Sequence, residues 1–413
     1  MIKIGTVFSG IGAIEQALKR LHVEHELVFA CDNGDVELCL LDKETQKEFR
    51  ALQTARGKRA LTDSGMKRLV ELSAKENEIA EQTRQVIYGL PSKEDKMAYV
   101  EKLYKDYSRK NNYVRQTYEA NYPDLGDFHL DIRFLDGKDY TGKIDLLVGG
   151  SPCQAFSAVG AQCGLEDTRG TLFYEFGRIV DETKPKVFIY ENVRGLTTHN
   201  VGNTWKVIQS VFDNLNYNIT EPQVLNAVDY GIPQTRRRLF VIGIRKDIVC
   251  NKFEYPNPIG CKFKMQDFLE ENCAYGHFFS DEQGNIVAEK VKGKPDPRFN
   301  LTPKVRDYVI KSGTKNFKTS VETDKDIART LVKTMTQHHR AGVDNYITIG
   351  YEEDGTKKLR ALTDRECLRL MGYPDSFKIV VGPMQIYRQA GNSIVVDVMM
   401  AIVKKIIETG VFE

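Results

Sequence analysis

The sequence lacks the features that mark membrane and exported proteins. No run of about 18 apolar residues, the length that crosses a bilayer, occurs in the 413-residue chain. The opening MIKIGTVFSGIG has no signal-peptide layout and reads directly as a strand. We find no internal repeat and no low-complexity tract. We therefore expect a globular cytoplasmic protein with no membrane partner.

Cysteines are few and scattered. The eight cysteines form no C-x-x-C pair, and none has the spacing of a zinc site. Disulfides are not expected in a long chain of this kind. The sequence therefore predicts no metal site, and it leaves packing or nucleophilic chemistry as the main alternatives for Cys153 in GGSPCQAFS.

Charge is nearly balanced overall but uneven along the chain. The net charge is only +2, yet residues 298–340 carry ten Lys or Arg against four Asp or Glu. A basic segment can follow a phosphate backbone. It can equally be a solvated surface, and charge alone does not decide between the two.

Apolar runs alternate with helical patterns. We predict strands at 2–8, 26–31, 144–148, 186–190 and 238–244. Apolar residues at helical spacing predict a helix over 13–21, and a helical crossover is expected over about 171–184. This alternation indicates an α/β fold: a parallel sheet with helices on both faces.

Two segments interrupt the alternation. Residues 43–112 carry 16 basic and 11 acidic side chains and few strand signals. Within them, 92–107 reads as a helix with Ser92 as its N-cap and Asp95 three residues on. Residues 251–345 are rich in proline and irregular, and we interpret them as a second, smaller domain. The apolar tail 393–410 predicts a buried helix.

The first turn and the second strand suggest a nucleotide site. Glycines at 10 and 12 lie between a strand and a helix, where backbone can approach a ligand. Asp32 ends the next strand, a position that commonly binds the ribose of an adenosine-containing cofactor. The pattern is not G-x-G-x-x-G, and NAD and S-adenosylmethionine both remain open at this point.

Three polar motifs follow predicted strands or lead into one. Cys153 and Glu191 would meet at one carboxyl edge of the sheet, where open α/β sheets bind ligands. Arg236 and Arg238 would share a face and supply the positive charge that a thiol of pKa about 8.5 needs to react as a thiolate. Glu191 could act as a proton donor if burial raises its pKa. Such a set suits addition of a thiolate to an electron-poor ring, followed by attack of a ring carbon on a methyl sulfonium.

At this point the motifs resemble those of the cytosine-C5 DNA methyltransferases of bacterial restriction–modification systems. The segments that carry the resemblance come in the family's order: TVFSGIGAIEQAL, GGSPCQAFS, EDTRGTLFYEFGRIV, ENVRGL, DYGIPQTRRRLFVIG, LRALTDRECLRLMGYPDSF and YRQAGNSIVV. The resemblance covers most of the chain outside 36–112 and 251–330. It implies a Rossmann-like methyltransferase sheet, with a helical insertion at 36–112 and a smaller target-recognition domain.

The resemblance also implies roles for individual residues. Cys153 would attack C6 of a cytosine flipped out of duplex DNA, Glu191 held by Asn192 would protonate or bind N3, and Arg238, with Arg236, would contact O2 and the thiolate region. S-adenosylmethionine would supply the methyl group. The residues expected to hold this cofactor are Phe8, Gly10, Gly12, Asp32, Asn33, Asp131, Ile132, Pro152, Leu172, Asn392 and Ile394. The residues expected to contact DNA are Gln154, Ser157 and Arg169 around the target and Arg329 and Arg340 for base readout.

The sequence departs from the family pattern after Asp32. About 75 residues separate this motif from the helix that usually follows it soon. Cys31-Asp32-Asn33 also replaces the family's more usual Glu followed by a bulky residue over the adenine. We expect the insertion to contact flanking DNA or to shield the cofactor, with a solvated ornament as the alternative. The expected domains are 1–250 with 384–413 for catalysis and 251–383 for target recognition and hinge.

Other functions remain possible on the sequence alone. A tRNA cytosine methyltransferase has a similar set of motifs, but the long basic region at 251–345 favours duplex DNA. A silent DNA-binding regulator would not need Cys153, Glu191 and both arginines, and an unrelated NAD enzyme would need none of this set. A cognate restriction endonuclease, acting at the same site without direct contact, is a possible partner.

Overall fold

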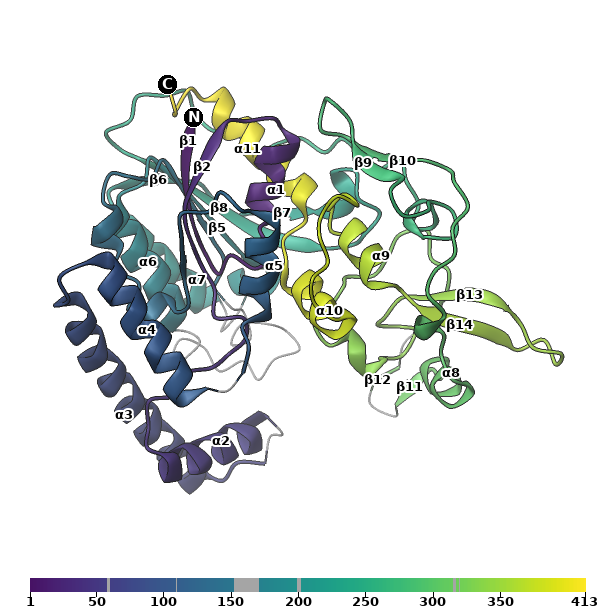
Figure 1. Cartoon of the computed structure of the whole chain (residues 1–413), viewed down its shortest axis with the longest axis horizontal. Helices are drawn as coiled ribbons and strands as arrows, with labels where there is room; N and C mark the ends of the chain where they lie inside the picture. The colour runs from purple at the N-terminus through teal and green to yellow at the C-terminus, as the bar shows by residue number, and fades with distance from the viewer. Residues whose placement is uncertain (58–59, 109, 152–170, 199–201, 315–316, 319) are drawn as a thin grey trace.

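A mixed sheet of eight strands forms the centre of the computed structural model, which describes residues 1–57, 60–108, 110–151, 171–198, 202–314, 317–318 and 320–413. Its strands run in the order β3-β2-β1-β4-β5-β8-β6, and β7 also pairs with β8 (Figure 1). The strands are β1 (Ile2–Val7), β2 (His25–Cys31), β3 (Asp127–His129), β4 (Leu146–Gly149), β5 (Val187–Val193), β6 (Tyr217–Ile219), β7 (Gln223–Asn226) and β8 (Arg237–Arg245).

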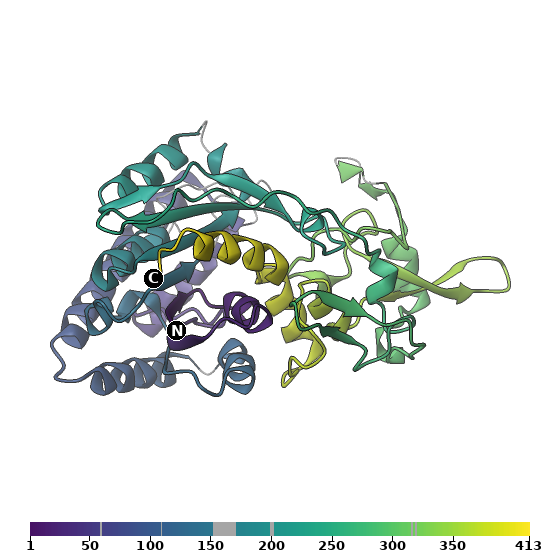
Figure 2. The same cartoon turned by 90° about the horizontal axis from the view of Figure 1, so that it is seen from above.

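Helices cover both faces of the sheet, as predicted (Figure 2). Side chains alternate along each strand, so Leu146 and Val148 of β4 point to one face and Leu147 to the other. The first face packs against α1 (Ala13–Arg20), α5 (Tyr113–Asn121) and α11 (Val396–Glu408). The second packs against α6 (Thr171–Thr183) and α7 (Asn203–Asp213). The predicted α/β fold is therefore confirmed.

The direction of β8 differs from the prediction of a parallel sheet. β8 runs antiparallel to β5, β6 and β7. Only residues 227–236 separate β7 from β8, and so short a connection suits an antiparallel pair, whereas a parallel pair needs a crossover of about a dozen residues or more. As a consequence, the start of β8 lies beside the end of β5, where Arg238 pairs with Val193.

The insertion is helical, as predicted, and contains α2 (Lys43–Gly57), α3 (Asp63–Tyr88) and α4 (Lys93–Tyr107). Ser92 caps α4 and accepts a hydrogen bond from the Asp95 amide at 3.1 Å, as expected. α4 is fixed to the sheet by the ion pair of Lys93 with Asp127 of β3 at 2.6 Å. α2 projects from this body at the bottom of Figure 1 and packs on α3 through Phe49.

Short elements follow β8 and form the smaller lobe to the right in Figure 1. Two buried arginines form ion pairs that stabilise this lobe: Arg360 pairs with Glu366 at 2.8 Å, and Arg369 pairs with Asp375 at 2.7 Å. Among the described helices, none is long and apolar enough to cross a membrane. The elements of this lobe are η8 (Met265–Phe268), β9 (Phe278–Ser280), β10 (Ile286–Ala288), η9 (Pro297–Phe299), α8 (Pro303–Val309), β11 (Gly313–Thr314), β12 (Phe317–Lys318), η10 (Met335–Gln337), β13 (Tyr346–Tyr351), β14 (Lys357–Ala361) and α9 (Asp364–Arg369). After the lobe, α10 (Pro383–Asn392) leads to α11.

Candidate active site

The carboxylate of Glu191 lies near the end of β5 and has one close cationic partner. The Arg238 Nε atom lies 3.1 Å from Glu191 Oε1, and the two side chains are 19% and 14% exposed. Burial raises the pKa of Glu191, and the positive charges of Arg238 and Arg236 partly oppose that rise. Glu191 is thus a carboxyl group able to hold a proton more readily than a solvated one.

The chain passes directly against Glu191 where it leaves β4. A Cβ atom on Gly150 would lie 2.6 Å from Glu191 Oε2 and 2.8 Å from the Glu191 carbonyl oxygen, so only glycine fits there without a shift. Ser151 follows and is buried. The segment that leads to Cys153 is therefore held within contact of the carboxyl group.

Asn192 fixes this segment and does not contact Glu191. Its Nδ2 group donates hydrogen bonds to the Ser151 carbonyl oxygen at 3.2 Å and to the Tyr190 hydroxyl oxygen at 2.8 Å. The Ser151 and Tyr190 hydroxyls are 2.8 Å apart. Asn192 points to the opposite face of β5 from Glu191, because successive strand residues alternate.

Five predicted site residues lie outside the described residues. They are Pro152, Cys153, Gln154, Ser157 and Arg169, all within 152–170.

Arg236 joins three segments that are far apart in the sequence. It is 2% exposed, and its guanidinium donates to the carbonyl oxygens of Leu331 at 2.8 Å, Gly391 at 2.8 Å and Ser393 at 2.6 Å. Its positive charge is felt at Glu191, but the close ion pair is made by Arg238. In this structure Arg236 therefore holds the small lobe and the 391–393 segment against β8.

The turn after β1 brings Gly10 and Asp32 into direct contact. The Gly10 amide donates to Asp32 Oδ2 at 2.9 Å, and the Gly34 amide donates to Oδ1 at 2.7 Å. Burial raises the pKa of Asp32 to about 6. Phe8, at φ 54°, and Gly12, at φ 81°, both have left-handed backbone conformations that shape the turn.

This turn has the shape of a cofactor cradle. A Cβ atom on Gly10 would meet no atom within 4 Å, so space lies open beside the backbone. A Cβ atom on Gly12 would lie 2.4 Å from the ring of Tyr122, so the helix start cannot carry a side chain there. An open glycine backbone next to a carboxylate suits a ribose, whose hydroxyls donate to carboxylate oxygens. The residues present therefore fit an adenosine-containing cofactor.

The residues predicted to surround the adenine are only partly available. Asn33 caps its own turn by accepting from the Asp35 amide at 3.1 Å. Ile132 is buried, and the Asp131 carboxylate is bound by Arg133 at 2.8 Å and by the hydroxyl of Tyr104 from α4 at 3.1 Å. The insertion thus contacts the Asp131 side of the cradle through Tyr104.

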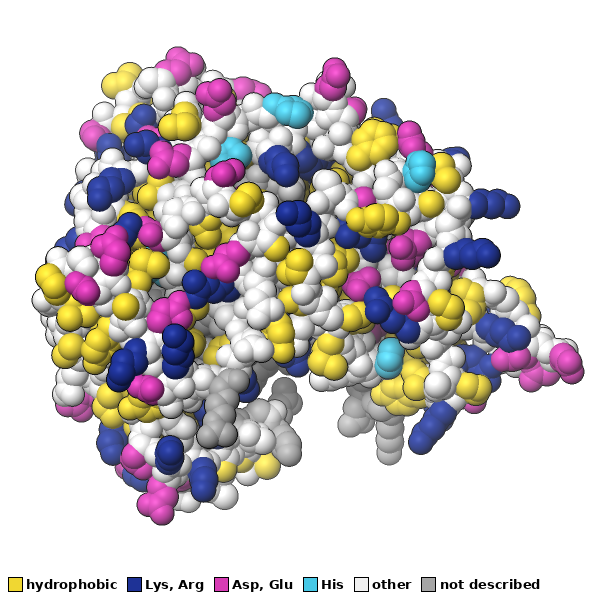
Figure 3. Space-filling view, in the orientation of Figure 1, with side chains coloured by type: hydrophobic (Ala, Val, Ile, Leu, Met, Phe, Trp, Pro, Cys, Tyr) yellow, Lys and Arg dark blue, Asp and Glu magenta, His cyan; other side chains and the backbone are white. Residues whose placement is uncertain are grey.

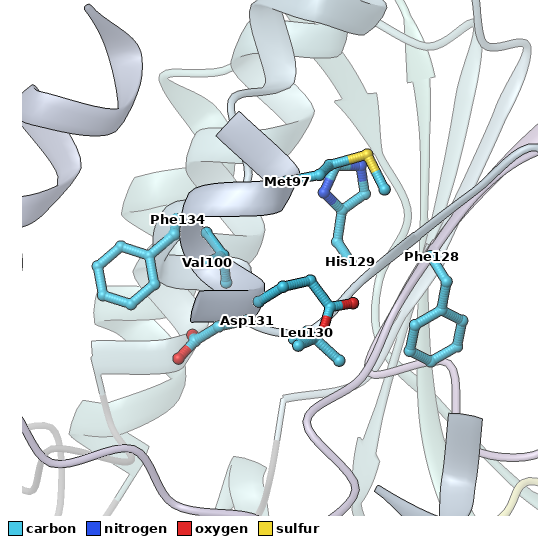
Figure 4. A pocket seen from close by; sticks show the side chains of 8 residues that line it. Met97, Val100, Phe128, His129, Leu130, Asp131 and Phe134 are labelled. Carbon is cyan, nitrogen blue, oxygen red and sulfur yellow. The ribbon is translucent and has the colours of Figure 1, made fainter. Parts of the chain in front are cut away.

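Figure 4 shows the junction between α4 and β3 beside Asp131. Met97 and Val100 of α4 line a cavity with His129 and Asp131, and its volume of ≈ 10 Å³ leaves room for about one water molecule. α4 therefore packs closely on this edge of the sheet and leaves no room for a ligand there.

The remaining cofactor predictions fall on α6, on the last residue of α10 and on the short connection from α10 to α11. Leu172, in α6, packs against the core of the second face. Asn392 ends α10 and is exposed, and Ile394 is partly buried against the core of the first face. Both flank Ser393, whose carbonyl oxygen is bound by Arg236.

The two arginines predicted to read bases make contacts within the small lobe. Arg329 forms an ion pair with Glu322 at 3.2 Å and donates to the Ala341 carbonyl oxygen at 3.2 Å. Arg340 lies over the ring of Tyr308, with its guanidinium carbon 4.6 Å from the ring centroid. Neither arginine extends freely in this structure.

Sequence reasoning missed the residues that hold these groups in place. Gln234 is fully buried, donates to the Leu370 carbonyl oxygen at 2.7 Å and accepts from the Leu331 amide at 3.1 Å. The signal that could have found Gln234 and Ser151 is their position inside the motifs DYGIPQTRRRLFVIG and GGSPCQAFS. Tyr104 lies in the insertion, and nothing in its local pattern marks a contact with Asp131.

These features define the class of the protein. An α/β sheet with an antiparallel β8, a glycine turn after β1 and an acid at the end of β2 form the fold of the S-adenosylmethionine-dependent methyltransferases. Two solved structures share this fold. The Dnmt2 methyltransferase of S. pombe has a TM-score of 0.59 at 16% identity, with 99% of each chain covered. The methyltransferase EhMeth of Entamoeba histolytica has a TM-score of 0.61 at 14% identity, with 99% of this chain and 98% of that chain covered.

Sequence comparison gives the family. The model of the C-5 cytosine-specific DNA methylases matches residues 99–408. The Type II methyltransferase M.HhaI of Haemophilus parahaemolyticus is 35% identical over 292 residues, which are 71% of this chain and 84% of that protein. M.HpaII of Haemophilus parainfluenzae is 34% identical over 304 residues, which are 71% of this chain and 80% of that protein. The chain belongs to the C-5 cytosine-specific DNA methylase family and is a DNA (cytosine-5-)-methyltransferase, which confirms the predicted resemblance.

Proposed function

We propose that this enzyme transfers the methyl group of S-adenosylmethionine to C5 of a cytosine flipped out of a specific duplex DNA sequence, through a covalent bond between Cys153 and C6. The observation that supports it most is the buried Glu191 carboxyl group. It is paired with Arg238 and lies against Gly150, three residues before Cys153. The proposed proton donor therefore lies beside the chain that leads to the proposed nucleophile.

The proposed reaction begins at C6. The thiolate of Cys153 adds to C6 while Glu191 gives its proton to N3, and the electron pair that this creates makes C5 nucleophilic. Bound S-adenosylmethionine would supply the methyl group to C5 and leave as S-adenosylhomocysteine. A base then removes the C5 proton, the C6–S bond breaks and Cys153 leaves as a thiolate. N3 returns its proton to the Glu191 carboxylate, and 5-methylcytosine is the product.

The raised pKa of Glu191 suits its proposed role as the proton donor to N3. A carboxyl group with its ordinary pKa would be ionised at neutral pH and would have no proton to donate. Burial raises the pKa of Glu191 and so favours its protonated form, and Arg238 stabilises the carboxylate that remains after transfer. Arg238 would also contact the base O2, and Asn192 would keep the 150–153 segment in register.

We assign the cofactor to the cradle described above. Asp32 would hold the ribose, Phe8 and the glycine turn would approach the sulfonium side, and Ile132 would lie beside the adenine. The residues proposed to line the site are Phe8, Gly10, Gly12, Asp32, Asn33, Asp131, Ile132, Pro152, Leu172, Asn392 and Ile394.

Duplex DNA would lie between the catalytic part, residues 1–250 and 384–413, and a target-recognition region at 251–383. Extrusion of the cytosine costs a few kcal/mol, which contacts from Gln154, Ser157 and Arg169 would offset. Arg329 and Arg340 lie in the basic segment that we assign to base readout. Because the relatives named above are Type II methyltransferases, we propose that a cognate endonuclease acts at the same site without touching this protein.

Transfer of labelled methyl groups tests the proposal. The purified enzyme is incubated with methyl-labelled S-adenosylmethionine and with either duplex DNA or tRNA. We expect label in duplex DNA, at a single sequence context on bisulfite sequencing, and a large loss of rate in Glu191→Gln. Label in tRNA and none in duplex DNA would assign the substrate to RNA and refute the proposal.

A further inference from the structure

The outer side of α2 carries a row of basic side chains. Lys43, Lys47 and Arg50 are four and three residues apart, so they lie on one side of the helix. All three are exposed, and none forms an ion pair within the described part of the chain. We call these three residues the α2 basic row.

Two of the three acids next to this row are engaged elsewhere, and the third, Glu44, is exposed in the first turn of α2. Glu48 is turned to α3, where Arg68 donates to it at 2.9 Å and 3.0 Å. Asp42 precedes the helix and caps it, accepting from the Thr45 amide at 3.0 Å. The sequence from residue 43 to residue 59 carries six Lys or Arg and two Glu, so this end of the insertion is strongly basic.

The row stands on a rigid support. Phe49, Leu69 and Leu72 form a small core that fixes α2 to α3. α3 is in turn fixed to the catalytic part, where Arg84 of α3 donates to the Arg133 carbonyl oxygen at 2.8 Å. A basic helix on a well-packed arm is positioned to meet a partner and need not become ordered on contact.

The arm lies at the edge of the sheet where the candidate site is built. Figure 1 shows α2 beyond the carboxyl end of β1, on the side opposite the small lobe. Figure 3 shows the molecular surface hollowed between the two. The small lobe carries the other basic segment, 298–340, with ten Lys or Arg against four acids. The α2 basic row and the basic segment 298–340 therefore lie on either side of the sheet edge that carries Glu191.

We propose that the α2 basic row binds the phosphate backbone of duplex DNA that flanks the target site, on the side away from the small lobe. The inference rests on the proposed function, because it takes duplex DNA as the substrate. Regularly spaced lysine and arginine side chains suit phosphates, which repeat along each strand irrespective of sequence. The contact strengthens binding of extended DNA and does not contribute to the choice of target sequence.

The test compares two triple variants. K43Q/K47Q/R50Q removes the charge of the row and keeps residues that favour a helix. K19Q/K246Q/K404Q is the matched control: it removes the same charge from three exposed lysines outside the insertion and outside 251–383, none of which has an ion-pair partner in the described residues. Dissociation constants are measured at several salt concentrations on a long duplex of about 30 base pairs and a short one of about 12, each centred on the target found by bisulfite sequencing.

The row variant should bind the long duplex at least about tenfold more weakly than wild type, with a salt slope shallower by about 2 to 3. Its affinity for the short duplex and its methylation rate there should match wild type, and the control should match wild type on both. Unchanged long-duplex affinity and slope would overturn the inference, as would an equal loss on both lengths, which would place the contact at the target. Failure of the wild-type enzyme to methylate either duplex would refute the proposed function instead, and this inference with it.

Discussion

A buried carboxyl group in α1 gives a pH-dependent stability that can be calculated. Glu15 is fully buried just behind the glycine turn, and the Tyr118 hydroxyl of α5 donates to its Oε1 atom. Burial raises the pKa of Glu15 from its ordinary value of 4.5 to about 7. Glu15→Gln removes the ionisation and keeps an oxygen that can accept from Tyr118.

The direction of this pH dependence follows from how tightly the folded and unfolded states bind the proton of Glu15. Because the folded state binds the proton more tightly, the stabilisation is fully present below pH 4.5 and is lost as pH rises through 7. At 1.36 kcal/mol for each pKa unit, the whole effect is about 3 kcal/mol, of which about 2.5 kcal/mol is lost between pH 5 and pH 8. The glutamine variant should therefore gain about 2 to 3 kcal/mol relative to wild type over this interval.

Urea unfolding at a series of pH values measures this difference directly. Glu26→Gln, which removes an exposed carboxyl group from β2, is the matched control and should keep the pH dependence of the wild type. Parallel pH dependence of wild type and Glu15→Gln would refute the reasoning, because it would mean that Glu15 ionises in the folded protein as easily as in the unfolded chain.

Two further predictions concern the active site. Arg238→Met should raise the pKa of Glu191 further, because it removes the positive charge 3.1 Å from the carboxylate; difference infrared titration against Glu191→Gln measures this, and the exposed Arg237→Met should leave the value unchanged. Asn192→Ala should lower the free energy of unfolding by about 1 to 3 kcal/mol, because it strips the buried Ser151 carbonyl group of its partner, and should also lower kcat. Unfolding curves and steady-state rates that coincide with wild type would contradict the role given to Asn192.

Much of the fold could be predicted because its signals are local. The strand at Ile2–Val7 is an apolar run, the α1 helix has apolar residues at helical spacing, and the cap of α4 at Ser92 follows from a short motif. Each of these depends on neighbours in sequence. The direction of β8 could not be predicted from local signals, because it depends on the short connection from β7 and on pairing with β5 residues that lie 45 or more positions earlier.

The arrangement within the site was harder to predict for the same reason. The sequence predicted Arg236 and Arg238 near Glu191. It did not predict that Arg238 makes the ion pair with Glu191 while Arg236 binds backbone carbonyl groups. Arg236 bonds to carbonyl groups 95 to 157 residues away, and Tyr104 reaches Asp131 from an insertion that the family pattern does not contain. Such contacts are set by packing between distant segments, and no spacing along the chain records them.

The central claim is that Cys153 forms a bond to the target base. The most direct measurement uses duplex DNA with 5-fluorocytosine at the target position, whose fluorine cannot leave as the C5 proton does. With S-adenosylmethionine present, the account predicts a stable protein–DNA complex whose cross-linked peptide contains Cys153, and no complex with Cys153→Ser. Continued methyl transfer by Cys153→Ser, or a cross-link mapped to a different residue, would contradict the account.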